Sequence, residues 1–368
     1  MEYVHEKEDW PNFTWDQTAL ADALADVRNR QGRLVGRMEA LGFHNQSEAV
    51  LKTLTQDVIK TSEIEGERLA DDQVRSSLAR RLGMDIAGLV ASDRNVDGVV
   101  EMMLDATQKF AAPLNEERLF SWHSSLFPTA RSGLKRIVTG AWRTAETGPM
   151  QVVSGPIGRE RVHFEAPAAE RLPAEMRRFF DWFEDPALAI DPVMKAGVAH
   201  FWFVTVHPFE DGNGRIARAV ADLALARSDQ TKQRFYSMSS QIRIERNAYY
   251  STLEACQKGG LDITHWLDWF LACLGRAIGN SAAMLETVLA KARFWEQHAD
   301  AGFNDRQKIM LTRMLDGFEG KLTSSKWAIL AKCSQDTALR DIDDLLRRQI
   351  LVKEEAGGRS TSYLLAPA

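Results

Sequence analysis

The residues best suited to chemistry lie in one run, His207-Pro208-Phe209-Glu210-Asp211-Gly212-Asn213-Gly214-Arg215-Ile216-Ala217-Arg218. Gly212 and Gly214 let a backbone approach a ligand closely, and the free N–H groups at a helix start after them form an anion site. Arg215 and Arg218 are three residues apart, so they share one helical face just inside that terminus. Two guanidinium groups beside an amide-lined loop favour a polyphosphate ligand.

Two further side chains in the run complete a set for group transfer. His207 is the group nearby that can take a hydroxyl proton near neutral pH. Asp211 supplies the hard oxygen that Mg²⁺ prefers, with phosphates completing its ligand shell. The alternative is a plain helix–loop–helix corner with solvated arginines. A base, a metal ligand and a phosphate cradle within so short a run instead favour phosphoryl or nucleotidyl transfer.

Two predicted helices must position this run. The apolar segment 196–206 predicts a buried helix that delivers His207 at its end, where Pro208 stops it. The segment 214–228 predicts the helix that carries both arginines. The reactive residues are therefore expected in the loop between two packed helices.

The run resembles, at every specified position, the motif HPFxDGNGRxxR of the Fic family. The resemblance implies a Fic-fold helical bundle that transfers AMP from ATP to a Ser, Thr or Tyr hydroxyl of a target protein, with Mg²⁺. The roles it implies are a base (His207), a metal ligand (Asp211), an α/β-phosphate cradle (Gly212, Asn213, Gly214), an inner-phosphate ligand (Arg215) and a γ-phosphate ligand (Arg218).

Two other segments resemble parts of the same family. Residues 150–153 and 161–164 bracket a turn rich in glycine and proline, which predicts an isolated β-hairpin. It is similar to the family's flap, which pins the target chain by strand addition, here through Val152, Val153, Val162 and His163. The segment 246–257 looks like the part that closes over adenine, with Tyr249, Tyr250 and Gln257 in the nucleotide pocket.

The segment 61–66 predicts a helix end with Gly66 at the C′ position. Acids at a helix C-terminus oppose the macrodipole, by about 0.3–1 kcal/mol each, which suggests a cationic partner. The segment resembles the family's inhibitory pattern, with Thr61, Glu65 and Gly66 at its fixed positions. The resemblance implies that Glu65 pairs with Arg218 and blocks the γ-phosphate.

Most of the chain has helical periodicity, so we expect a mainly α protein. The predicted organisation is an N-terminal helical region with the inhibitory helix (1–95), a catalytic core (96–285), a connecting helix (286–303) and a winged-helix domain (304–368). Within the last, three helices at 305–317, 324–331 and 335–347 precede a two-stranded ribbon. The predicted wing is 357–361.

Composition and charge limit the classes of partner that we expect for this chain. The hydrophobic fraction is 45%, the charged fraction 26% and the formal net charge −5, which argues against a nucleic-acid coat or a membrane-surface binder. From Asn304 onward there are 11 Lys and Arg against 9 Asp and Glu, so DNA binding by 304–368 is not favoured over protein docking. The N-terminus resembles no secretory signal and no segment could span a bilayer, so we expect a cytoplasmic protein.

Several alternatives stay open at the level of sequence. The chain could instead be a nucleotide-sensing transcriptional regulator that binds DNA, although such a sensor needs no base at 207. An enzyme that removes AMP, or that both adds and removes it, fits the same motif. The target protein, for which the chain itself is a candidate, and a homodimer are not decided by the sequence.

Overall fold

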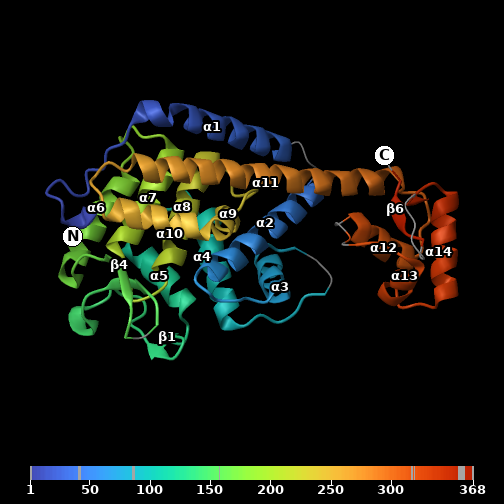
Figure 1. Ribbon diagram of the computed structural model, residues 1–368, viewed down its shortest axis with the longest axis horizontal. Coiled ribbons are helices and arrows are strands. Elements are labelled where there is room, and N and C mark those ends of the chain that lie inside the picture. Colours follow the sequence, from blue (N-terminus) through green and yellow to red (C-terminus); the bar gives the residue numbers. More distant parts are fainter. Residues whose placement is uncertain are drawn as a thin grey trace. The chain divides into compact units, whose positions relative to one another are not determined.

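The computed structural model describes residues 2–39, 43–84, 88–156, 158–315, 318, 320–354 and 361–366. It divides into two compact units, Met1–Ala282 and Ala283–Ala368. The described residues are mainly helical with small two-stranded sheets, so the predicted mainly α fold class is confirmed (Figure 1). The finer subdivision at 95/96, 285/286 and 303/304 stays a prediction.

The elements follow the predicted order closely. Before the motif the helices are α1 Gln17–Glu39, α2 Phe43–Ile64, α3 Asp71–Arg81, α4 Arg94–Gln108, α5 Glu116–Leu126, α6 Leu172–Glu184 and α7 Pro192–Val206. After it come α8 Asn213–Asp229, α9 Met238–Ile244, α10 Arg246–Gln257, α11 Thr264–Gln297, α12 Asp305–Leu315, α13 Ser324–Leu330 and α14 Gln335–Arg347. Short 3₁₀ turns cover Val4–Glu6, Ala145–Thr147 and Ala169–Arg171.

Three antiparallel pairs make up the β-structure: β1 Arg131–Ser132 with β2 Lys135–Arg136, β3 Gln151–Ser154 with β4 Arg161–Glu165, and β5 Leu351–Lys353 with β6 Tyr363–Leu365. The β3–β4 pair is the hairpin predicted from the sequence, and Val153 lies opposite Val162 in its register. A register shift between Val152 and Val153 bends β3. No further strand extends this pair within the described ranges.

Helices α7 and α8 form the centre of the first unit and pack along each other (Figure 1). Asp191 caps α7 by accepting from the Val193 N–H at 2.8 Å, and Pro192 stands at its first position, where a missing N–H costs nothing. From residue 196 to its end α7 is buried and mostly apolar, as expected for a core helix. This packing fixes the end of α7, and thus His207.

One predicted helix starts later than expected. The periodicity predicts a helix over 243–257, and α10 matches it from Arg246 onward, whereas residues 243 and 244 belong to α9. The two helices are separated at Glu245, whose φ of −98° and ψ of 24° are not helical. The Glu245 carboxylate is held from outside by Arg276, with both guanidinium contacts at 2.6 Å. This interaction comes from a distant helix, so local periodicity could not reveal it.

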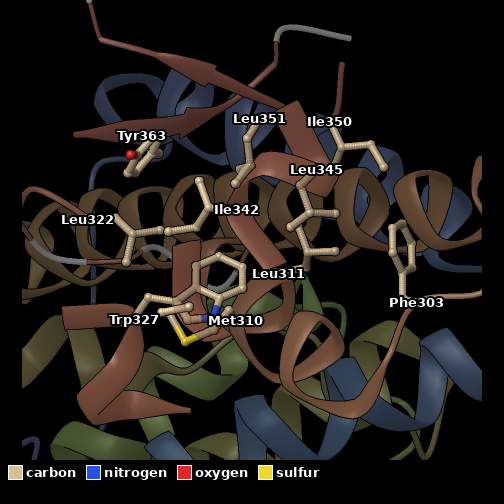
Figure 2. Packing of buried hydrophobic residues seen from close by; sticks show 11 residues of the cluster. Phe303, Met310, Leu311, Leu322, Trp327, Ile342, Leu345, Ile350, Leu351 and Tyr363 are labelled. Carbon is tan, nitrogen blue, oxygen red and sulfur yellow. The ribbon is translucent and has the colours of Figure 1, made fainter. Parts of the chain in front are cut away.

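The second unit has its own core beneath α12, α13, α14 and the β5–β6 pair (Figure 2). The side chains of Trp327, Ile342, Leu345 and Met310 are fully buried there. Three helices followed by a two-stranded sheet is the predicted order, and the winged-helix identification stays a prediction. The predicted wing lies, except for Thr361, outside the described residues.

No helix in the described part of the chain is long and apolar enough to cross a membrane.

Candidate active site

A cavity of about 660 Å³ lies between the end of α2, the β3–β4 hairpin, the loop before α8 and helix α10. Among the predicted site residues, those that line it are Glu65, Val152, Val153, His163, His207, Asp211, Gly214, Tyr249, Tyr250 and Gln257. The remaining predicted site residues do not line the cavity: Thr61, Gly66, Val162, Gly212, Asn213, Arg215 and Arg218. The structure thus brings segments from four parts of the chain to one cavity.

His207 borders the cavity at the C-cap of α7, in a left-handed conformation with φ of 50° and ψ of 58°. Its Nδ1 lies 3.1 Å from the carbonyl oxygen of Val204. Because a carbonyl only accepts hydrogen bonds, Nδ1 carries the proton in this contact. In the neutral ring, Nε2 is therefore the atom with a lone pair for a proton.

The surroundings keep the His207 ring neutral. Burial, the largest contribution, lowers the pKa of His207, and the nearby Arg143 guanidinium lowers it further. The Val204 carbonyl and the carboxylates of Glu65 and Asp211 act in the opposite direction without cancelling the shift. A neutral imidazole near pH 7 is the form that can accept a hydroxyl proton.

The loop before α8 is closed by Asn213. Its side-chain nitrogen donates to the Phe209 carbonyl at 2.8 Å, and its side-chain oxygen accepts from the Phe209 N–H at 2.9 Å. The Asn213 side chain is thereby engaged within the loop and buried. Its backbone N–H remains available to the predicted phosphate cradle, and the place of Asn213 in that cradle stays a prediction.

Gly212 makes the turn of this loop. Its φ of +80° lies in the region that favours glycine, and a Cβ there would meet the Phe127 ring at 2.9 Å. Since α8 starts directly after it, the first backbone N–H groups of α8 have no partners within their own helix. They are the N–H groups from which the sequence predicts an anion site, and that role stays a prediction.

Both motif arginines are buried with 2% of their surface exposed. Each has a buried N–H group without a hydrogen-bond partner among the described residues, Nε of Arg215 and Nη1 of Arg218. Arg215 also lies over the Phe127 ring, 5.0 Å from its centroid. Buried cations with unused donors are costly, and an anionic ligand would satisfy them.

The end of α2 supplies the present partners of Arg218. Its Nε donates to the Thr61 hydroxyl at 2.8 Å, and its Nη2 donates to the Thr61 carbonyl at 2.9 Å and to Glu65 Oε1 at 2.8 Å. A Cβ added to Gly214 would lie 2.2 Å from the same Oε1. The Glu65 carboxylate therefore lies directly over the start of α8, against the predicted phosphate cradle.

A Schellman turn fixes this carboxylate. The Glu67 N–H donates to the Ser62 carbonyl at 3.0 Å, and the Gly66 N–H donates to the Glu63 carbonyl at 3.1 Å. Gly66 has a φ of +86°, which the turn requires. Glu65 is thereby the C-cap residue of α2, and the chain turns so that Glu67 faces the motif as well.

Glu67 is a candidate functional residue that the sequence interpretation missed. Its Oε2 accepts from Nη1 of Arg215 at 2.7 Å. The arginine side chain is 3% exposed and the glutamate side chain 49%. A single turn thus places one carboxylate on each motif arginine. The sequence signal that could have revealed Glu67 is the pair of acids on either side of Gly66, the glycine predicted to end α2.

Asp211 is held at the entrance to the loop. Its Oδ1 accepts from the Gly212 N–H at 2.6 Å, and its Oδ2 accepts from the Ser132 hydroxyl. Its backbone carbonyl contacts Nε2 of His123 at 3.2 Å. No group of three or more His, Cys, Asp or Glu side chains suited to a metal occurs among the described residues. One carboxylate is nevertheless enough for a Mg²⁺ that arrives on a nucleotide, because phosphates and water fill its remaining positions.

The three residues predicted to contact adenine differ in their burial and in their contacts. Tyr249 is buried, and its hydroxyl lies 2.9 Å from Nε2 of His200. Gln257 is buried with its amide nitrogen 3.2 Å from the Thr205 hydroxyl. Tyr250 is more open and lies under the Arg246 guanidinium, 5.2 Å from its ring centroid. All three border the cavity, and Tyr250 is the least committed to the core.

The β3–β4 hairpin forms another wall. Val153 and Val162 are 48% and 39% exposed, as expected for residues that could dock a chain. His163 differs, because its Nδ1 lies 2.6 Å from Glu254 Oε2 and its Nε2 contacts the Ser154 hydroxyl at 2.5 Å. His163 therefore ties the hairpin to α10, and its ring is not free to meet a target.

Solved structures share this architecture. A Fic family protein from Desulfovibrio desulfuricans G20 is 21% identical and has a TM-score of 0.54, with 97% of this chain and 98% of that chain covered. A Fic domain containing signaling protein from Bacteroides thetaiotaomicron has a TM-score of 0.52 at 20% identity, covering 71% of this chain and 97% of that one. The fold is thus the helical fold of Fic proteins, as the sequence indicated.

Sequence comparisons show which proteins parts of the chain resemble. Residues 113–225 match the Fic/DOC family and residues 3–84 match a domain of unknown function, DUF4172. The chain is 32% identical over 191 residues to protein adenylyltransferase fic-1 of Caenorhabditis elegans, with 50% of this chain and 35% of that protein covered. For protein adenylyltransferase Fic of Culex quinquefasciatus the identity is 25% over 260 residues, with 68% and 47% covered. The chain spans less than half the length of these curated relatives, and the match to the Fic/DOC family covers its residues 113–225.

Proposed function

We propose that this protein is an adenylyltransferase that moves AMP from Mg²⁺-ATP to a hydroxyl group of a target protein. The observation that carries the proposal is the cavity itself, where Nε2 of His207 is the lone-pair atom of a neutral ring and two buried arginines have unused donors nearby. The names of the curated relatives support the same reaction.

In the proposed complex, the start of α8 and the two arginines bind the polyphosphate. Arg215 holds the inner phosphates and Arg218 the γ-phosphate. Asp211 would hold the Mg²⁺, which supplies charge neutralisation on the phosphates when bound. The adenine would lie toward α10, where Tyr250 offers the most open ring face.

The transfer itself needs one base. The target hydroxyl oxygen forms a bond to the α-phosphorus, and the bond from that phosphorus to the bridging oxygen of the β-phosphate breaks, so pyrophosphate leaves. The hydroxyl proton passes to Nε2 of His207. The Nδ1–H contact with Val204 holds the ring in the tautomer that can accept it.

The conformation in the structure is proposed to be an inhibited one. Glu65 and Glu67 occupy the two motif arginines with carboxylate oxygens at 2.8 Å and 2.7 Å, which are the positions that phosphates would need. ATP must displace both carboxylates before it binds in full. Removal of Glu65 should therefore activate transfer.

The target is proposed to dock on the β3–β4 hairpin. Val153 and Val162 present apolar side chains, and the outer edge of this two-stranded pair can accept an added strand. The hairpin borders the cavity beside His207, so a docked strand would carry its hydroxyl close to the base.

ATP labelled at either the α- or the γ-phosphate tests the reaction. The Glu65→Gly protein is incubated with each label and a host lysate, and the modified proteins are identified by mass spectrometry. We expect incorporation from the α-label alone, on Ser, Thr or Tyr, and none in a Glu65→Gly, His207→Ala double variant. Incorporation from the γ-label would instead indicate a phosphotransferase. Loss of AMP from premodified target in the wild-type protein, dependent on Glu65, would indicate a removing activity.

A further inference from the structure

Arg143 is a buried arginine in the loop between β2 and β3, with 4% of its surface exposed. Its Nε donates to the His207 carbonyl at 2.8 Å, and its Nη2 donates to the Pro167 carbonyl at 2.5 Å and, more weakly, to the Val206 carbonyl at 3.5 Å. Its backbone N–H donates to the Pro208 carbonyl at 3.0 Å. One residue therefore contacts three consecutive residues around the proposed base.

The partners of Arg143 are unusual for a buried cation. All of its hydrogen-bond partners are backbone carbonyls. No carboxylate among the described residues lies close enough to form an ion pair with it, although the charge of Glu170 acts on it from farther away. Burial lowers the pKa of Arg143 to about 10, so the side chain is still charged at neutral pH. Burying a charge without an ion pair costs free energy, so we expect the fold to gain a compensating interaction from this arginine.

The compensating interaction is with the carbonyl groups at the end of α7. The last carbonyls of a helix have no partners within it and carry the negative end of the macrodipole. Val206 is the last residue of α7 and His207 is its C-cap. Arg143 meets these two carbonyls and so satisfies acceptors that the helix leaves open.

Arg143 also restrains the backbone of the proposed base. His207 has a positive φ, which is unfavourable for a residue with a Cβ and persists only when its surroundings enforce it. The Phe203 carbonyl accepts from its N–H at 3.0 Å on one side, and Arg143 holds its carbonyl on the other. With both peptide groups fixed, the ring is directed to the cavity.

The charge of Arg143 has a second effect. A helix C-terminus favours the protonated form of a histidine. The charged groups that act on His207 are Arg143, Glu65 from α2 and Asp211 from the motif loop, and both carboxylates also favour protonation. Arg143 is the cation that opposes them. Without it, the ring would protonate at a higher pH and lose its lone pair.

We propose that Arg143 is a positioning residue that holds His207 in its left-handed C-cap conformation and keeps its ring in the neutral, proton-accepting form. The proposal rests on the proposed role of His207 as the base. Arg143 touches neither the nucleotide nor the target in this account, since it acts through His207 alone.

The test uses Arg143→Met and Arg143→Lys in the Glu65→Gly protein. Arg118→Met is the control for losing an arginine at a helix end, because Arg118 contacts the Asp105 and Lys109 carbonyls at the end of α4, at 2.9 Å and 3.1 Å. Unlike Arg143, it also pairs with the Asp105 carboxylate, at 2.7 Å. For Arg143→Met we expect kcat to fall by about 10²-fold, the usual cost of a misplaced catalytic group, with KM for ATP within about twofold. The acidic limb of its pH–rate profile should move to higher pH.

The lysine variant separates geometry from charge. Arg143→Lys keeps the cation but not the forked contacts, so kcat should fall while the acidic limb stays in place. Behaviour of Arg143→Met like that of Arg118→Met in both readouts would overturn the proposal. If Arg143→Met does not fold, an unchanged kcat in Arg143→Lys would overturn it.

A titration of His207 by NMR of histidine-labelled protein distinguishes this proposal from the proposed function. It is made without nucleotide and needs no activity, with the His207 signal assigned by its loss in His207→Ala. The pKa of His207 should rise in Arg143→Met and stay unchanged in Arg118→Met. An unchanged pKa in Arg143→Met would contradict the proposal even if AMP transfer occurs. A raised pKa supports it even if the Glu65→Gly protein transfers nothing.

Discussion

The carboxylate of Glu65 lies 2.8 Å from Nη2 of Arg218, although 153 positions separate the two residues in the chain. Two positions later Glu67 contacts Arg215 in the same way, at 2.7 Å. A single Schellman turn at Gly66 directs both acids to the start of α8. We therefore regard the end of α2 as a two-carboxylate latch (Glu65 and Glu67) on the proposed phosphate site.

The Glu65 half of the latch should discriminate between nucleotides. Glu65→Gly is expected to raise the affinity for ATP relative to that for ADP about tenfold, because a hydrogen bond to a charged group is worth about 1.5–3 kcal/mol and must be given up to admit the γ-phosphate. Isothermal titration calorimetry with both nucleotides measures the ratio. An equal gain for ADP and ATP would show that Glu65 does not oppose the γ-phosphate.

The Glu67 half should act on the inner phosphates. Glu67→Gln is expected to tighten ADP binding about two- to fivefold, since a half-exposed ion pair contributes about 0.5–1 kcal/mol. The same calorimetry measures it. Glu63→Gln is the matched control, because Glu63 belongs to the same turn but pairs with Lys60 and Arg243. An ADP affinity that does not change in Glu67→Gln, or changes equally in the control, would remove Glu67 from the latch.

The contact between α4 and α5 depends on Gly98. A Cβ at this position would lie 1.8 Å from the Ser125 carbonyl oxygen, so the two helices must separate to admit it. Gly98→Ala should lower the free energy of unfolding by at least about 1–3 kcal/mol, as overpacking does. In contrast, Gly36→Ala in α1 meets nothing within 4 Å and should stabilise the helix by about 0.5–1 kcal/mol. Urea unfolding of both variants compares them, and a Gly98→Ala protein as stable as the wild type would contradict the packing.

Stability should fall on mild acidification because of His200. Burial, the largest cause, together with the nearby Arg218, lowers the pKa of His200 to about 3. The unfolded chain therefore takes up a proton on His200 below about pH 6.5, whereas the folded protein does not. The contribution of His200 to the free energy of unfolding is fully present above that pH and is lost as the pH falls toward 3. The loss is on the order of 1 kcal/mol per pH unit. His200→Gln should lose less stability between pH 7 and pH 5 in urea unfolding, and an identical loss would show that His200 does not titrate in this way.

Much of this structure follows from local sequence signals. The apolar run before His207, Pro208 and the glycine turn at 212 predict α7, the loop and α8 correctly, because each acts on its own neighbours in the chain. The β3–β4 hairpin is predicted for the same reason. The break at Glu245 is not, since Arg276 holds that residue from another helix.

The site was predictable to a different extent. The pairing of Glu65 with Arg218 came from the family resemblance, because no local rule connects residues so far apart. Glu67 and Arg143 were missed, since their roles depend on a turn geometry and on a loop that folds against α7. The contacts of the Asn213 side chain with both backbone polar groups of Phe209 were likewise not predicted, because they depend on how the loop closes on itself.

In the proposed mechanism His207 is the base for AMP transfer, and Glu65 holds the site shut by its contact with Arg218. Intact-protein mass spectrometry after incubation with Mg²⁺-ATP tests it most directly, on the wild-type, Glu65→Gly and Glu65→Gly, His207→Ala proteins together with the identified target. We predict a mass gain of one AMP on the target or on the chain itself that is at least about tenfold faster with Glu65→Gly than with the wild type. The double variant should show none. Equal rates for the wild type and Glu65→Gly, or undiminished transfer in the double variant, would contradict the account.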